Sequence, residues 1–288
     1  MVVEQKRIAL EKDVVVNCDE TCCKVRKYDH YKKCYMWVLV NKAERVVIFF
    51  YEDGSRGRDV LTNFLGDAEL KALMSDGYNA YVFIGNELNP HRYKDTDHQV
   101  CLAHVRAKFV RARMEGGDKR ADVFLDNINR LFRFAREYDR EMSTDGERTR
   151  RRQGLPTMEA MINLRANLLQ ELKSEEEQKS CYMREPLNYL HKFWKEAFTY
   201  IKDGRYPISN NLAERAVRPF TTKRKNSLHF GSDEGAEIAA VYHCIISTVR
   251  PQGRFAWDYL GKFFTGIFNG CRDFLSLTPQ NIDLAVCQ

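Results

Sequence analysis

The stretch DVVVNCDETCCKVRKYDHYKKCYMWVLVNKAERVVIFFY, residues 13–51, decides the fold. It contains three runs rich in β-branched and aromatic residues, at 13–19, 35–41 and 45–51, and such runs are typical of buried strands. A turn of only a few residues separates the second run from the third, which predicts a β-hairpin. The first run ends in a carboxylate, so the pattern places Asp19 at the C-terminal end of a central strand.

The residues after the hairpin extend the sheet. The segment GSRGRDVLTNFLGD, residues 54–67, carries apolar residues at helical spacing, and short strands are predicted at 72–75 and 98–103. A hairpin followed by a strand that is reached through a helix predicts a mixed sheet. The fold class is therefore α/β (α+β), a mixed sheet with flanking helices.

The character of the chain changes after about residue 104, where charged amphipathic helices with a period near 3.6 replace strands. Within this part the charged stretch 143–154 predicts a loop, and further on Pro219 predicts the end of a helix. We divide the chain into a first part of the core at 1–104, a helical insertion at 105–203, a second part of the core at 204–254 and a C-terminal helical tail at 255–288.

Composition excludes several classes of protein. With 44% hydrophobic and 30% charged residues, the chain is expected to fold as a soluble globular protein. No apolar run approaches the roughly 18 residues of a membrane helix, and the charged N-terminus does not resemble a signal peptide, so we expect no membrane partner and a cytoplasmic location. The nine irregularly spaced cysteines predict reduced thiols.

The net charge of +6 is distributed in three basic runs. Such clusters suit a partner with a long phosphate backbone, but they are equally typical of solvated helix faces, and both interpretations stay open on charge alone. The runs are Arg106, Lys108, Arg111 and Arg113; Arg148, Arg150, Arg151 and Arg152; and Arg215, Arg218, Lys223, Arg224 and Lys225.

Three acidic residues are candidates for a metal centre. Asp19 and Asp76 each follow an apolar strand, and Glu214 lies in a helix whose polar face it shares with Arg215 and Arg218. If they converge, the clustered like charges require a cation, and hard oxygen ligands select Mg²⁺ or Mn²⁺. Two such ions would clamp the attacking and leaving oxygens of a phosphoryl displacement. Taken singly, each acid is also compatible with a structural role as a turn former or a solvated helix residue.

Four segments resemble transposases of the insertion sequence 66 family, a branch of the Asp-Asp-Glu (DDE) enzymes. They are NCDET at 17–21, SDGYNAY at 75–81, VCLAHVRAKF at 100–109 and DGRYPISNNLAERAVRPFTTKRKNSLHFGSDEGAEIAA at 203–240. The last segment is long and specific, and the four occur in the family's order. The resemblance implies Asp19, Asp76 and Glu214 as the catalytic triad. It also implies an RNase H-like core that is interrupted by a helical insertion.

The resemblance further implies metal-dependent DNA strand cleavage and strand transfer by in-line displacement, with two Mg²⁺ or Mn²⁺ ions. Arg215 and Arg218 are then expected to position phosphates, and His104 and Arg106 to line the edge of the site, although a structural role for His104 stays open. Lys223, Arg224 and Lys225 are expected to contact the DNA backbone. A zinc site at Cys101 and His104 is a weaker alternative, because no paired Cys-x-x-Cys motif accompanies them.

The expected partner is double-stranded DNA, both element ends and target, bound by a homo-oligomer in a bacterial cytoplasm at the nucleoid. Family members usually carry N-terminal segments, including a module that binds element ends, before the first catalytic strand. Here that strand starts close to Met1, so we expect the chain to be a fragment, a truncated copy or one part of a multi-protein system in which accessory proteins supply end recognition. Two alternatives stay open: an RNase H-like nuclease that only hydrolyses DNA, and an inactive DNA-binding remnant.

Overall fold

The computed structural model describes residues 1–86, 93–174 and 180–283, which form two compact units. The first, called the core unit, comprises Met1–Leu73, Tyr78–Thr96 and Asn211–Gln288. The second, called the helical unit, comprises Met74–Gly77 and Asp97–Asn210. The two are described in turn.

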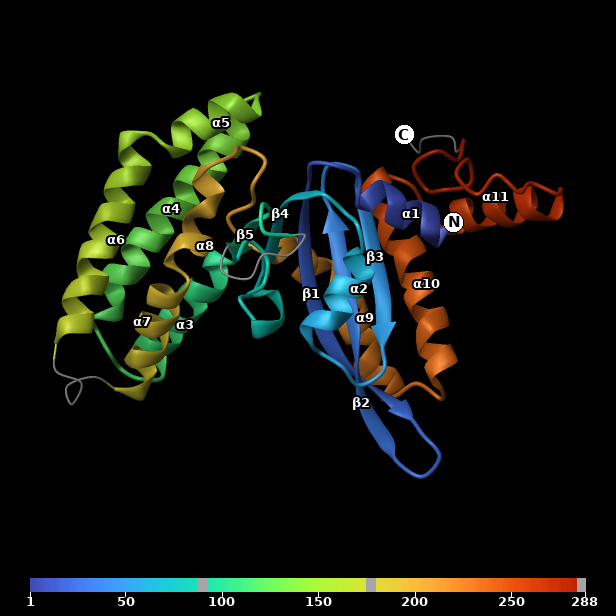
Figure 1. The fold of residues 1–288 in the computed structure, drawn as a ribbon, viewed down its shortest axis with the longest axis horizontal. Helices are drawn as coiled ribbons and strands as arrows, with labels where there is room; N and C mark the ends of the chain where they lie inside the picture. Colours follow the sequence, from blue (N-terminus) through green and yellow to red (C-terminus); the bar gives the residue numbers. More distant parts are fainter. Residues whose placement is uncertain (87–92, 175–179, 284–288) are drawn as a thin grey trace. The chain divides into compact units, whose positions relative to one another are not determined.

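A long antiparallel meander forms the body of the core unit (Figure 1). It consists of β1 (Val14–Arg26), β2 (Tyr31–Asn41) and β3 (Val46–Glu52). The register pairs Asp19 with Val38, and Val38 in turn with Phe49. Side chains of β2 are buried on both faces from Met36 onward, which explains why its sequence is a continuous apolar run.

The complete sheet is mixed and has five strands in the order β3-β2-β1-β4-β5. β4 (Leu70–Ser75) follows α2 (Arg58–Leu65), and β5 (Asp97–Val100) comes next in the chain. The sheet is flanked by helices, as the RNase H-like expectation requires, and the α+β class is confirmed.

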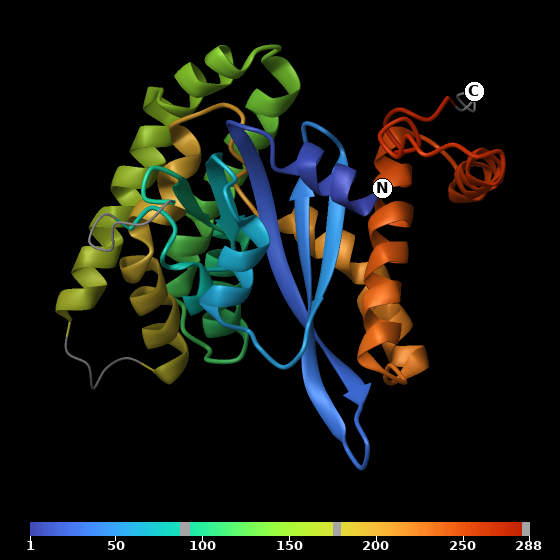
Figure 2. The same ribbon diagram turned by 45° about the vertical axis from the view of Figure 1, so that its right-hand side comes forward.

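Two helices, α9 (Asn211–Ser227) and α10 (Asp233–Val249), pack against the meander in the core unit (Figure 2). α10 runs beside the edge strand β3 and satisfies its free amides with side chains. The Cys244 thiol accepts the Phe49 N–H at 3.0 Å, and the Thr248 hydroxyl accepts the Val47 N–H at 3.0 Å. An open strand edge invites pairing with another chain, and α10 covers this one.

The remaining helical segments of the core unit are short or peripheral. α1 (Val2–Ala9) packs on β3, and α11 (Ala256–Phe268) follows α10. Single-turn 3₁₀ helices lie at Asn79–Tyr81 and Arg250–Gln252.

The helical unit is a bundle with its own apolar interior. Phe109 and Phe124 stack at 4.5 Å between ring centroids, and Leu131 and Leu164 are fully buried. Its helices are α3 (Leu102–Met114), α4 (Ala121–Glu141), α5 (Asp145–Arg152), α6 (Leu155–Lys173), α7 (Cys181–Lys192) and α8 (Trp194–Phe198), with a 3₁₀ turn at Thr199–Ile201. Among the residues that the structure describes, none of the helices combines the length and apolar character that crossing a bilayer requires.

Several predicted boundaries were wrong. β1 continues seven residues past Asp19, so this residue lies in the middle of a strand rather than at its end. β5 ends at Val100, and residues 102–103 already belong to α3. The helix that carries Glu214 does not stop before Pro219 but continues to Ser227, because a proline removes one helical hydrogen bond without forcing the chain to leave the helix.

The charged stretch 143–154 was predicted as a loop but contains α5. A capping box starts this helix: the Thr144 hydroxyl accepts the Glu147 N–H, and the Glu147 carboxylate accepts the Thr144 N–H. Arg152, at its end, is buried and donates to the carbonyls of Tyr200, Asp203 and Tyr206. The arginine therefore holds the segment before α9 together and is not available to a phosphate.

Candidate active site

Asp19 lies on the face of β1 that looks toward α9. The side chain is half-buried, and its Oδ1 accepts the N–H of Glu20 at 2.9 Å. Alternate residues of a strand share a face, and the next residue on the Asp19 face, Thr21, accepts a hydrogen bond at 2.9 Å from Arg224 of α9. The carboxylate of Asp19 therefore lies on the side of the sheet that α9 covers.

The neighbouring residue, Glu20, points to the opposite face and anchors the strand. Its side chain is completely buried, where it forms a salt bridge with Arg56 and accepts a hydrogen bond from the Tyr81 hydroxyl. The guanidinium of Arg56 lies 3.8 Å from the ring centroid of Tyr78, a cation–π contact. A buried carboxylate is tolerated only when it is paired in this way. The pairing holds the backbone of β1 in place directly beside Asp19.

Glu214 lies in the first turn of α9 and is half-buried. The inner face of this helix is formed by Ala213, Val217 and Phe220, which are buried against the meander. Arg215 and Arg218 are exposed, as the predicted helix face requires. Because α9 packs on β1, the core unit brings the strand that carries Asp19 against the helix that carries Glu214.

Asp76 belongs to the helical unit, where its backbone is held in a fixed turn. The Tyr189 hydroxyl of α7 donates a hydrogen bond to the Asp76 carbonyl. Gly77 has a positive φ of 80°, and a Cβ at this position would lie 2.7 Å from the Tyr189 hydroxyl oxygen and 3.3 Å from Val100. Only glycine fits both the conformation and the space, so the Asp-Gly turn is dictated by its surroundings.

A buried hydrogen bond between Ser75 and His98 also stabilises the Asp76-Gly77 turn. The Ser75 hydroxyl lies 3.0 Å from His98 Nε2 and also accepts the Gly77 N–H at 3.3 Å. Burial lowers the pKa of His98 to about 4, so its imidazole is neutral at ordinary pH. Neither His98 nor Tyr189 was singled out by the sequence analysis, since nothing in the sequence shows which distant residue contacts Asp76.

The basic run of α3 is largely occupied by protein contacts. Arg106 donates to Asn129 Oδ1 at 2.7 Å, Lys108 pairs with Glu185, and Arg113 pairs with Asp122 at 2.7 Å. His104 is half-buried on the same helix. Solvated helix faces with local ion pairs, the second interpretation that the charge distribution left open, therefore account for most of this run.

The basic run of α9 differs, because four of its cations have no acidic partner within the described part of the chain. No carboxylate of residues 1–86, 93–174 or 180–283 pairs with Arg215, Arg218, Lys223 or Lys225. Arg215, Arg218 and Lys223 line one shallow depression on this helix, together with Thr222 and Asn226. Arg224 instead turns inward to Thr21 and the Cys22 carbonyl. A row of uncompensated cations on one helix face is the arrangement that attracts a phosphate backbone.

The sheet order, the flanking helices and the separate helical unit define an α+β protein built on a mixed five-stranded sheet. The comparison with known families agrees: the model described as "Transposase IS66 family" matches residues 1–238. This match covers most of the chain, so the chain belongs to the IS66 family of transposases.

Curated relatives come from Sinorhizobium fredii (strain NBRC 101917 / NGR234). The chain is similar to "Uncharacterized protein y4jD", with 25% identity over 83% of this chain and 47% of the relative. It is also similar to "Uncharacterized protein y4qI", with 26% identity over 82% of this chain and 43% of that relative. The chain thus spans less than half the length of these relatives.

Proposed function

We propose that the chain is the catalytic part of a DNA transposase, in which Asp19, Asp76 and Glu214 together hold divalent metal ions. The observation that carries this proposal is the packing of α9 on β1, which puts Glu214 and Asp19 on elements in contact. Asp76 belongs to the helical unit, so assembly of the full triad requires that unit to present its Asp-Gly turn to the core unit.

The donor set fits Mg²⁺ or Mn²⁺ better than a softer metal. All three proposed ligands are carboxylates, and small hard cations prefer oxygen donors. Asp19 and Glu214 are only half-buried, so their carboxylates keep access to solvent, through which an ion and a phosphate can enter. A bound pair of ions would stabilise charge on the attacking and leaving oxygens of the phosphodiester.

The protein's own residues have two tasks in this scheme. The buried side chain of Glu20, the tight turn at Gly77 and the packed inner face of α9 anchor the backbone segments that carry the three proposed ligands, and anchored ligands lower the cost of organising the transition state. Arg215, Arg218 and Lys223 bind the DNA backbone along α9, where no protein carboxylate of the described residues competes for them.

The proposed reaction has two in-line displacements at phosphorus. In the first, a water oxygen bonds to the phosphorus at the element end and gives its proton to solvent, while the bond to the 3′-oxygen breaks and that oxygen takes a proton from solvent to become a free hydroxyl. In the second, this hydroxyl loses its proton to solvent and bonds to the phosphorus of a target phosphodiester, and the displaced 3′-oxygen of the target strand leaves and takes up a proton. No covalent bond to the protein forms in either step.

The partners follow from this function. Double-stranded DNA, both element ends and target, is the proposed substrate, and joining two ends favours a homo-oligomer. Because the chain spans less than half the length of its curated relatives, we propose that end recognition comes from further protein segments or accessory proteins. The expected place of action is the bacterial nucleoid.

Nicking of element-end DNA in Mg²⁺ or Mn²⁺ tests the proposal. Asp19→Asn, Asp76→Asn and Glu214→Gln should each abolish nicking, while Glu237→Gln, the same change at an exposed position of α10, should retain it. Equal activity in all these proteins would remove the triad assignment. Strand-transfer products separate a transposase from a nuclease that only hydrolyses, and DNA binding without cleavage in either metal would favour the inactive remnant.

A further inference from the structure

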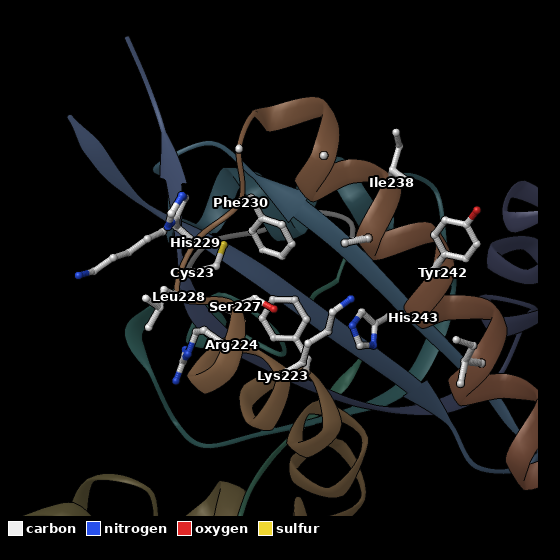
Figure 3. Close-up of a pocket in the computed structure, with 16 residues that line it drawn as sticks. Cys23, Lys223, Arg224, Ser227, Leu228, His229, Phe230, Ile238, Tyr242 and His243 are labelled. Atoms are coloured by element: carbon white, nitrogen blue, oxygen red, sulfur yellow. The ribbon is translucent and has the colours of Figure 1, made fainter. Parts of the chain in front are cut away.

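The core unit contains a second feature on the same side of the sheet, a pocket of about 590 Å³ between α9 and α10 (Figure 3). Its floor is β1 at Cys23 and Lys24, and its end wall is the segment Ser227–Gly231, which links the two helices. None of the residues assigned to the triad lines it. The pocket falls within the size range of small-molecule sites in proteins.

Three rings contribute to the lining of this pocket, those of Phe220, Phe230 and His243, and of these Phe220 is almost fully buried in the core beneath it. The ring centroids of Phe220 and Phe230 lie 6.0 Å apart with an angle of 28° between the ring planes, and the centroid of His243 lies 5.2 Å from that of Phe220 with an angle of 69°. The Phe230 backbone is bound to β1 by its N–H to the Lys24 carbonyl and its carbonyl to the Arg26 N–H, both at 2.8 Å. The Phe230 ring is therefore carried by fixed backbone and offers a preorganised apolar surface to the pocket.

The mouth of the pocket is cationic. The Lys223 side chain lies beside His243 (Figure 3), and burial together with the charge of Lys223 lowers the pKa of His243 to about 4. The imidazole is thus neutral at ordinary pH and offers one donor and one acceptor nitrogen. A site with apolar rings inside, a neutral hydrogen-bonding ring on the wall and a cation at the mouth suits a planar heterocycle that carries a phosphate.

Lys223 also lines the depression that contains Arg215 and Arg218. The two hollows therefore share one cation, and a DNA backbone that follows α9 reaches the mouth of the ring-lined pocket. Leu228, at the far rim, has a left-handed backbone (φ 58°), a conformation that is costly for a leucine and that turns the chain so that Phe230 meets β1.

From these observations we propose that the pocket binds one unpaired base of the DNA, stacked against Phe230 above the buried ring of Phe220, with its phosphate on Lys223. Stacking on aromatic side chains combined with backbone cations is how proteins hold bases that are not paired. This inference rests on the proposed function, since it takes DNA to be the substrate. It adds a recognition site for distorted or single-stranded DNA that is separate from the acidic residues.

The test compares two fluorescein-labelled duplexes of the same sequence, one fully paired and one with a single unpaired adenine, by anisotropy in EDTA. Wild type should bind the bulged duplex about 5- to 150-fold more tightly, the range that a stacked base provides. Ala239→Phe places a ring in the pocket and should abolish this preference. Ala166→Phe, the same change on an exposed face of α6, should leave it intact.

A second pair of variants tests the same proposal without placing a new ring in the pocket. Lys223→Gln should weaken binding of the bulged duplex more than binding of the paired one, whereas Lys225→Gln, with the same loss of charge on the same helix, should weaken both equally. Equal affinity of wild type for the two duplexes, or an unchanged preference in Ala239→Phe, would overturn the inference. Asp19→Asn should retain the preference, so failure of the triad and failure of the pocket give different results.

Discussion

The buried imidazole of His98, which is hydrogen-bonded to Ser75, should make the free energy of unfolding depend on pH in the acidic range. In the folded protein the pKa of His98 is about 4, against an ordinary value of 6.5, because the imidazole is buried. As the pH falls below about 6.5, the unfolded chain takes up a proton on this ring and the folded protein does not. The contribution of His98 to stability is therefore complete above about pH 6.5 and is lost as the pH falls toward 4.

The size of the effect follows from the shift. One pKa unit corresponds to about 1.4 kcal/mol, so at about pH 5 the free energy of unfolding has lost about 2 kcal/mol through His98 alone. His243 titrates over the same pH range, but its contribution cancels when wild type is compared with a His98 variant, because both proteins contain it. Asp53, whose pKa is lowered to about 2 mainly by its hydrogen bond to Lys27, acts only at lower pH.

Urea unfolding followed by circular dichroism, at about pH 7.5 and about pH 5, measures this contribution. Between the two pH values His98→Gln should lose about 2 kcal/mol less stability than wild type. His191→Gln, at an exposed position of α7, should behave like wild type. If His98→Gln loses as much stability as wild type over this range, the imidazole is not held neutral and the account of the Ser75 support is wrong.

Three further predictions follow from the site. Arg218→Gln should weaken DNA binding and lower the salt slope of the binding constant by about 1, whereas Arg113→Gln, whose side chain is already paired, should change the slope little in a salt titration. Arg56→Met leaves a fully buried glutamate without its salt bridge and should cost about 3 kcal/mol in denaturant unfolding. Tyr189→Phe removes the hydrogen bond to the Asp76 carbonyl; we expect nicking to need a higher Mn²⁺ concentration, and an unchanged metal midpoint would contradict this positioning role.

Most strands of the core could be predicted from the sequence, because strands that are buried on both faces consist of continuous apolar runs. The apolar runs at 35–41 and 45–51 became β2 and β3. The second half of β1 was missed because polar and apolar residues alternate there as in an exposed ribbon. The start of α5 could have been found from the pair Thr144 and Glu147, which has capping-box spacing.

The candidate site was less accessible to sequence reasoning. The three acids could be selected from local pattern and from resemblance, and their assignment as a triad stays a prediction, as does the division of the chain into domains. The contacts that support them could not be selected, because Tyr189 is 113 residues from Asp76 and Arg224 is 203 residues from Thr21. Such residues come into contact only in the folded protein. The local sequence around a tyrosine or an arginine in a charged helix does not indicate which distant residue it will contact.

An anomalous difference map from crystals grown with Mn²⁺ and element-end DNA tests the central claim most directly. We predict density for manganese coordinated jointly by the carboxylates of Asp19, Asp76 and Glu214. Manganese bound elsewhere, with Glu214 turned away from the other two carboxylates while DNA occupies the α9 face, would contradict the proposed chemistry.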